Sequence, residues 1–180
     1  MRVPLNGGPA ALVLAGSFSY DCASQANVCI VSEVLKDKGG VFSRLDPVRG
    51  RGPDVAKTEQ HFVRWSLSPN GKSIALLLEE GFSRIQVLRT DGGEARHIEL
   101  HDVYPQRIRW FPDSEHLCVS GSLSGSMSII RMDLDGNYKS IFRLPEGQGW
   151  LQLHNISPDG HYLTYSTRTW KTNVAMLEDF

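Results

Sequence analysis

The chain has few cysteines, almost no net charge and no long apolar run. Its 180 residues contain 3 cysteines, too few and too scattered for a disulfide scaffold or a zinc cluster. The formal net charge of −1 gives no bulk electrostatic reason to expect nucleic acid or an anionic membrane as partner. No apolar run approaches the roughly 18–20 residues that span a bilayer. The short stretch 10–15 lacks the features of a signal peptide. We therefore expect no membrane insertion by this chain.

Helical periodicity is also missing, because no stretch keeps a 3.6-residue apolar repeat for more than about one turn. A turn phrase recurs instead: "SPNGKSIALLL", "FPDSEHLCVS" and "SPDGHYLTYS". Its prolines, Pro69, Pro112 and Pro158, lie 43 and 46 residues apart. A second landmark, a turn of the Asp-Gly type, recurs every 40 to 45 residues at Asn6, Asp46, Asp91, Asp135 and Asp179. Two landmarks in phase indicate an internal repeat.

Each repeat is expected to contain four short strands. In the second unit, the aromatic run 62–68 leads into Pro69-Asn70-Gly71, and a mostly apolar run follows at 73–80. An alternating run at 84–90 and a more polar one at 95–100 complete the unit. Four antiparallel strands in about 44 residues are typical of a propeller blade. We predict an all-β propeller of four-stranded antiparallel blades, about four of them present, with Trp65 and Trp110 packed between blades.

The repeat predicts a single domain, 1–180, that is divided into blades at the connections between strands. These boundaries are 1–15 for an outer strand that completes the last blade, 16–60, 61–103 and 104–148 for blades 1 to 3, and 149–180 for three strands of blade 4. Residues 9–14 would then pair with 173–177. Alternatively, the chain is part of a larger ring, and its open blade faces would favour self-association.

The repeat phrases carry a family resemblance that covers essentially the whole chain. "SPNGKSIALLL", "SPDGHYLTYS" and "IIRMDLDGNYKSI" resemble the repeats of TolB-type, WD-repeat-like β-propellers. "GSFSYDCASQANVCIVSEV", "FSRLDPVRGRG" and "TWKTNVAMLEDF" resemble the C-terminal propeller of bacterial membrane-anchored sensors. In those sensors the propeller follows a Ser/Thr kinase or winged-helix domain and a membrane span. The resemblance implies a periplasmic or extracytoplasmic location and neither kinase activity nor DNA binding for this chain.

The function expected from the fold is non-catalytic binding of a protein or ligand, as the sensory or interaction part of a larger bacterial signalling or envelope protein. The alternative is the gating propeller of a prolyl-oligopeptidase-type serine peptidase without its catalytic domain. That domain needs Gly-x-Ser-x-Gly, whereas "GSLSGS" has Leu123 between its glycines. His97 and His101 would lie about 13 Å apart along a strand, too far for a shared metal. We expect no enzyme activity, metal or cofactor.

The inner strands are expected to place side chains at the mouth of the central channel. These positions are Tyr20, Asp21, Arg64, Arg107, Arg109, Gln152 and His154. A slip of one residue in register would turn each of them to the other face of its strand. Because three of them are arginines, we expect either a small anionic ligand or a carboxylate on a partner protein.

Two cysteines flank the first inner hairpin, "CASQANVC". If Cys22 and Cys29 face each other across antiparallel strands, their Cβ atoms come within disulfide distance. The extracytoplasmic location implied by the resemblance would favour oxidation. The alternative is a pair of buried thiols. Cys118, on a second strand, is expected in the core.

Overall fold

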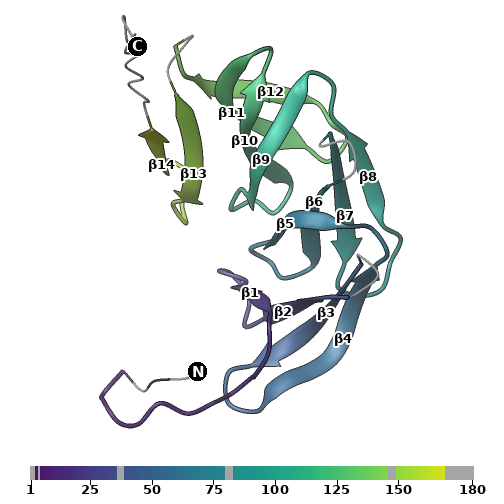
Figure 1. Cartoon of the computed structure of the whole chain (residues 1–180), viewed down its shortest axis with the longest axis vertical. Coiled ribbons are helices and arrows are strands. Elements are labelled where there is room, and N and C mark those ends of the chain that lie inside the picture. The colour runs from purple at the N-terminus through teal and green to yellow at the C-terminus, as the bar shows by residue number, and fades with distance from the viewer. Residues whose placement is uncertain (1–2, 4, 36–38, 80–82, 146–148, 169–180) are drawn as a thin grey trace, which may run out of the picture.

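The computed structural model describes residues 3, 5–35, 39–79, 83–145 and 149–168, and these form an all-β structure of antiparallel sheets. Figure 1 shows the sheets fanned around a central space, and in the three four-stranded sheets the first strand lies innermost and the fourth outermost. The described residues include no helix that is long and apolar enough to cross a membrane. The predicted fold class, an all-β propeller of four-stranded blades, is confirmed.

The strands follow the chain blade by blade, and every pairing joins consecutive strands. Blade 1 contains β1 (Ser19–Cys22), β2 (Cys29–Val34), β3 (Gly40–Asp46) and β4 (Gly50–Thr58). Blade 2 contains β5 (Phe62–Leu67), β6 (Ser73–Leu78), β7 (Arg84–Arg89) and β8 (Arg96–Glu99). Blade 3 contains β9 (Val103–Trp110), β10 (His116–Leu123), β11 (Ser126–Asp133) and β12 (Tyr138–Arg143). Blade 4 contains, among described residues, β13 (Trp150–Ile156) and β14 (Leu163–Arg168).

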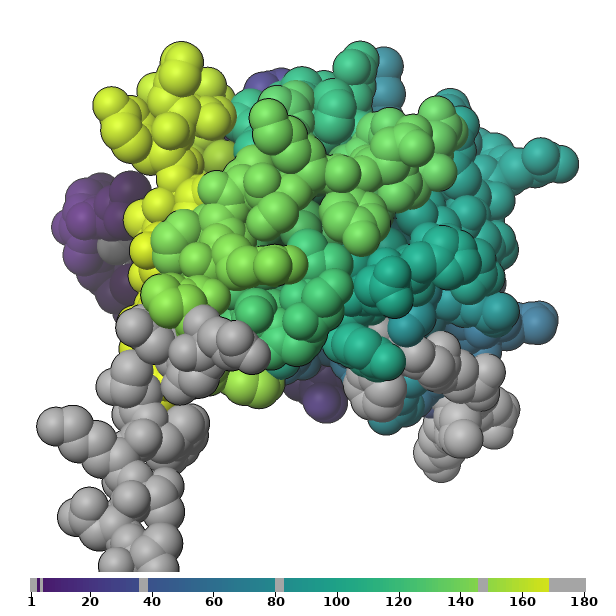
Figure 2. All heavy atoms as spheres, turned by 90° about the horizontal axis from the view of Figure 1, so that it is seen from above, coloured from purple at the N-terminus to yellow at the C-terminus, as the bar shows by residue number. Residues whose placement is uncertain are grey.

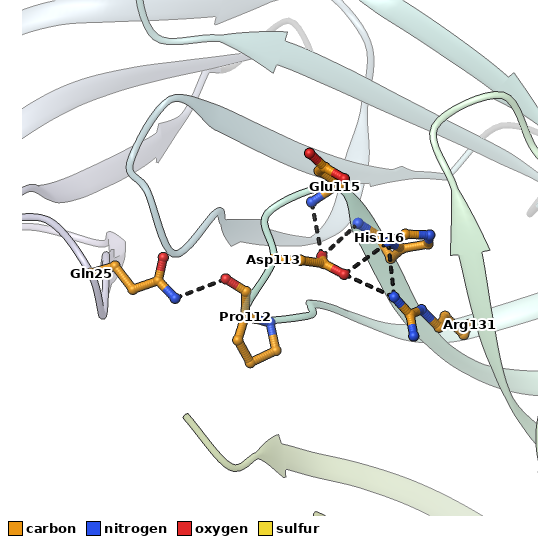
Figure 3. Close-up of polar contacts among 6 residues, drawn as sticks. All are labelled: Gln25, Pro112, Asp113, Glu115, His116 and Arg131. Atoms are coloured by element: carbon orange, nitrogen blue, oxygen red, sulfur yellow. Dashed lines mark hydrogen bonds and ion pairs between the residues drawn. The ribbon is translucent and has the colours of Figure 1, made fainter. Parts of the chain in front are cut away.

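The recurring turn phrase joins the first and second strands of a blade. Its fourth residue adopts left-handed backbone, with φ of 72° at Gly71 and 75° at Gly160. Blade 3 has Ser114 at this position, with φ of 58°. A non-glycine residue there is disfavoured by about 1–2 kcal/mol. Asp113 compensates, because its Oδ1 accepts hydrogen bonds from the backbone N–H groups of Glu115 and His116, both at 3.0 Å (Figure 3).

The core consists of three apolar layers, one between each pair of neighbouring blades. Strand β6 shows why the sequence reads as an unbroken apolar run. Leu76 packs in the cluster shared with blade 1, whereas its neighbour Leu77 packs in the cluster shared with blade 3. Phe111 and Leu151 belong to the third cluster, between blades 3 and 4. In Figure 2 the yellow-green atoms of blade 4 lie directly against the green atoms of blade 3. Each blade therefore hides the apolar face of the next.

Both tryptophans expected between blades make contacts there, although they occupy different positions in their strands. The Trp65 ring stands edge-on to Phe42 of blade 1, with ring centroids 5.3 Å apart. Trp110 is 5% exposed, and its Nε1 donates to the Ser66 carbonyl of blade 2 at 3.0 Å. Leu67 and Trp110 are the equivalent residues, because Leu67 pairs with Ile74 and Trp110 with Leu117, directly before and after the turn.

Residues 9–14 do not form the expected strand. Only Ala11 makes an isolated β-bridge, and the Val13 carbonyl lies against Gly50 at the β3–β4 turn. The segment is rich in small residues and glycine flanks it on both sides, so its intrinsic strand preference is weak. The proposed partner, 173–177, lies outside the described residues, and the completion of blade 4 stays a prediction.

The open face of blade 1 is polar rather than apolar. By the strand register, Val41 and Ser43 lie on the face turned away from blade 2, as do the cross-strand partners Lys57 and Asp54. Arg51 forms ion pairs there with Glu33 at 3.1 Å and with Asp54 at 2.9 Å. This face therefore lacks the apolar patch on which the expected self-association rests, and self-association stays untested.

Candidate functional site: the central cavity

The inner strands of all four blades surround a cavity of about 670 Å³. Strands β1, β5, β9 and β13 line it together with the turns that follow them. Of the seven positions expected at the channel mouth, six line this cavity: Tyr20, Asp21, Arg64, Arg107, Arg109 and His154. Gln152 lines a separate depression on blade 4, with Trp150 and Ser166. A volume of this size suits a small ligand or a short peptide segment.

The inner turns of blades 1, 2 and 3 are tied together beside the cavity. Gln25 lies at the tip of the first hairpin, in the position that Asn70 and Asp113 occupy in the later repeats. Its backbone N–H donates to the Pro69 carbonyl at 2.9 Å, and its side-chain Nε2 donates to the Pro112 carbonyl at 2.8 Å (Figure 3). The backbone N–H of Asn70 donates to Ser114 Oγ at 3.1 Å. These contacts fix the ends of three cavity-lining strands relative to one another.

Three arginines meet in the cavity from two neighbouring blades. Arg64 comes from β5, and Arg107 and Arg109 come from β9. The pKa of Arg107 is lowered from its ordinary value, first by burial and then by the positive charges of Arg64 and Arg109. The positive charge of Arg107 is therefore repelled by both neighbouring arginines. Such an arrangement costs free energy unless an anion compensates it.

None of the three arginines forms an ion pair with a carboxylate among the described residues. Arg64 Nη1 donates to the Val63 carbonyl at 2.7 Å, and Arg109 Nη1 donates to the Ile108 carbonyl at 3.1 Å. A guanidinium group has five N–H donors, so most of these donors remain available. Five arginines elsewhere, Arg51, Arg84, Arg89, Arg96 and Arg131, each contact a carboxylate, whereas Arg143 donates to the Leu123 carbonyl.

Asp21 links blades 1 and 2 through its carboxylate, so this carboxylate is not free to contact a ligand as the sequence suggested. Its Oδ2 accepts hydrogen bonds from the backbone N–H of Leu67 at 3.0 Å and from Ser66 Oγ at 3.4 Å. Its Oδ1 accepts from the backbone N–H of Cys22 at 2.9 Å. Tyr20 is 66% exposed at the rim of the cavity. Asp21 therefore belongs to the framework of the site, and Tyr20 to its solvent-facing edge.

His154 brings the fourth blade into the site. Its Nε2 lies 2.9 Å from Ser166 Oγ of the neighbouring strand β14. The side chain is exposed, and this is its one hydrogen bond to the described residues.

The structure joins Cys22 and Cys29 in a disulfide across the β1–β2 hairpin, where the two residues pair directly. Their Cα atoms lie 4.0 Å apart. Cys22 also lines the cavity, so the disulfide stiffens one of its walls. Cys118 is fully buried in the layer between blades 3 and 4, and burial raises the pKa of its thiol to about 12.

Several lining residues were not assigned to the site from sequence. The turn prolines Pro69, Pro112 and Pro158 line the cavity, as do Trp65 and Trp110. The sequence already showed that these prolines occupy equivalent turns. Equivalent turns in a propeller converge toward the axis, so the repeat itself contained the signal. Among the described residues, no three His, Cys, Asp or Glu side chains cluster as a metal site would require.

A propeller with a polar, arginine-lined central cavity is the class of protein that these observations define. Within that class the fold is TolB-like. The chain superimposes on TolB from Acinetobacter baumannii with a TM-score of 0.68 and 17% identity, over 95% of this chain and 43% of TolB. A chain of a nidogen/laminin complex matches with a TM-score of 0.57 and 15% identity, over 83% of this chain and 55% of that one.

An enzyme candidate shares the fold as well. A candidate 6-phosphogluconolactonase from Bacteroides uniformis matches with a TM-score of 0.53 and 18% identity, over 92% of this chain and 56% of that chain. No protein-family model matches this chain, and no curated protein matches it significantly. At these identities the likeness shows the fold alone, and the chain spans about half the length of the structures it resembles.

Proposed function

We propose that this propeller is a non-catalytic binding module that holds a small ligand or a segment of a partner protein in its central cavity. The observation that carries the proposal is the cavity itself, which all four described blades line with polar side chains and turn residues. Binding sites in proteins are commonly concave and of this volume. Its rim residues Tyr20 and Arg64 are exposed, so an incoming group can reach the site.

The module is proposed to be the sensory or interaction part of a larger bacterial signalling or envelope protein located outside the cytoplasm. Two observations support this placement. The repeat phrases resemble the propellers of bacterial membrane-anchored sensors, and the fold is TolB-like. The Cys22–Cys29 disulfide is typical of oxidising compartments. The complex of nidogen with laminin offers a precedent for a propeller-containing chain in a protein assembly.

The alternative function is the gating propeller of a serine peptidase. In the described blades, Gly121 to Ser126 run through the hairpin between β10 and β11, and Leu123 is 7% exposed. A nucleophile elbow requires a strand-to-helix turn with an exposed serine, so this segment does not supply one. The binding function is therefore the better supported of the two.

A steric plug tests the proposed function. Ser24 is exposed and lines the cavity, so Ser24→Trp fills space there, whereas Ser140→Trp adds the same bulk on the outer strand β12. A chemically diverse panel of small ligands and short peptides is measured by thermal shift. We expect at least one to stabilise the wild type and Ser140→Trp but not Ser24→Trp. A ligand at 100 times its Kd stabilises by about 2.7 kcal/mol. If every binding ligand stabilises all three proteins equally, the cavity is not the binding site.

A further inference from the structure

The charges that line the cavity do not balance. Its lining contains three arginines, Arg64, Arg107 and Arg109, and a single carboxylate, Asp21. The arginines therefore exceed the carboxylate by two positive charges. Asp21 is already engaged by the backbone of Leu67 and Cys22, so it does not turn to any of the arginines.

Among the three arginines, Arg107 gives the strongest support for an anionic partner in the cavity. It makes no hydrogen bond or ion pair to the residues that the structure describes, and its side chain is half-buried beside two other guanidinium groups. Buried or half-buried charges in proteins are normally paired. By contrast, even the exposed Arg84 on the outer surface has a carboxylate partner, Glu99, at 2.9 Å.

From this imbalance we propose that the cavity binds a dianionic group, held by Arg64, Arg107 and Arg109. This inference rests on the proposed function and names the ligand class of the same site. Two negative charges neutralise the excess, and guanidinium groups bind planar or tetrahedral oxyanions through two parallel N–H···O bonds. A phosphate monoester and a pair of neighbouring carboxylates both supply this chemistry.

Calorimetry with simple probes tests the inference at pH 7.5 and constant ionic strength. The probes are inorganic phosphate, succinate as a dicarboxylate, acetate as a monoanion and spermidine as a cation. We expect phosphate or succinate to bind at least about tenfold more tightly than acetate, because charge-assisted bonds to a second anionic oxygen are lost with acetate. Spermidine should not bind in the cavity.

The two dianion probes distinguish the source of the charge. Inorganic phosphate loses its second negative charge at a higher pH than succinate does. If phosphoryl is the occupant, phosphate binds more tightly than succinate and weakens between pH 7.5 and 5.5. If a carboxylate pair is the occupant, succinate is the tighter probe. Either result supports a dianion site.

A matched pair of variants locates the site. Arg107→Met removes the charge and keeps most of the apolar stem, and it should weaken the tighter dianion at least about tenfold. Arg84→Met removes an arginine from the outer surface and should leave the affinity unchanged. Unchanged unfolding midpoints show that both variants are folded. Arg64→Met provides a second cavity variant if Arg107→Met unfolds.

Three results would overturn the inference: acetate binding as tightly as both dianions, equal affinities for wild type and Arg107→Met, or equal losses for Arg107→Met and Arg84→Met. Absence of binding by both dianions would also overturn it. A neutral or cationic ligand that Ser24→Trp displaces would leave the proposed function standing while refuting the dianion. The two proposals therefore fail separately.

Discussion

Strand β6 offers a direct test of the propeller architecture, because two neighbouring leucines on it face different blades. Leu76 and Leu77 are each 0% exposed, and they belong to separate apolar clusters. Leu76→Ala removes contacts with the layer shared with blade 1, and Leu77→Ala removes contacts with the layer shared with blade 3. The loss of a fully buried leucine side chain costs about 2–5 kcal/mol, from transfer of the removed atoms plus the cavity left behind.

Each variant is therefore expected to lose about 3 kcal/mol in free energy of unfolding. The measurement is equilibrium urea unfolding followed by tryptophan fluorescence, since Trp65 and Trp110 lie at the same two interfaces. Ile141→Ala on β12 serves as the control, because Ile141 is 42% exposed and should lose less than about 1 kcal/mol.

The test of the architecture is that both variants lose a similar free energy of unfolding. A sheet with one solvated face, as in many antiparallel folds, would lose much at one leucine and little at the other. If either Leu76→Ala or Leu77→Ala costs no more than Ile141→Ala, one face of blade 2 is open to solvent, and the stacking of blades is wrong.

Three further predictions concern the cysteines and one ion pair. Removing the Cys22–Cys29 disulfide by double substitution to serine should lower the free energy of unfolding by about 2–3 kcal/mol. A dithiol reductant should lower the stability of the wild type to the same level. An unchanged urea midpoint in reductant would refute this prediction. Burial raises the pKa of the Cys118 thiol to about 12, so Cys118 should react with a thiol reagent only after unfolding. Labelling of Cys118 in native buffer would contradict its burial. The hydrogen bond from Arg89 lowers the pKa of Asp91 to about 2, so the contribution of this pair to stability is present above about pH 4 and is lost as the pH falls toward 2. Carboxyl NMR titration should show the Asp91 midpoint rising toward 3.8 in Arg89→Ala, and an unmoved midpoint would refute the pairing.

The sequence predicted the blades because the signals for them are local and repeated. Turn phrases like the one at Pro69-Asn70-Gly71, each followed by a strand-like run, occur in three of the four units, so each observation supports the others. Residues 9–14 had no such support, and their assignment as a strand depended on a distant partner rather than on local pattern. The structure shows no strand at these residues, and the Val13 carbonyl lies against Gly50.

The site was less predictable, because a side chain's partners depend on contacts between blades. Asp21 and Arg64 looked equivalent from sequence, as charged residues on inner strands. In the structure, Asp21 bonds to the backbone of Leu67, 46 residues away, whereas Arg64 forms no ion pair with a carboxylate among the described residues. Gln152 lies outside the cavity, in the second depression. Strand periodicity states which side chains share a face, but it does not state which of them find partners across the axis.

The arginines are held in place by the same packing that forms the blades, which bears on how tightly the cavity can bind. In β9, Arg107 and Arg109 alternate with Ile108 and Trp110, which are 0% and 5% exposed in the layer toward blade 2. Rotation of the strand would expose both apolar residues, so the arginine stems start from a fixed backbone. A site on a rigid strand loses less conformational entropy on binding than one on a loop. Because β9 lies in the middle of the described array, between blades 2 and 4, substitutions in either neighbouring core layer should weaken anion binding through displacement of this strand.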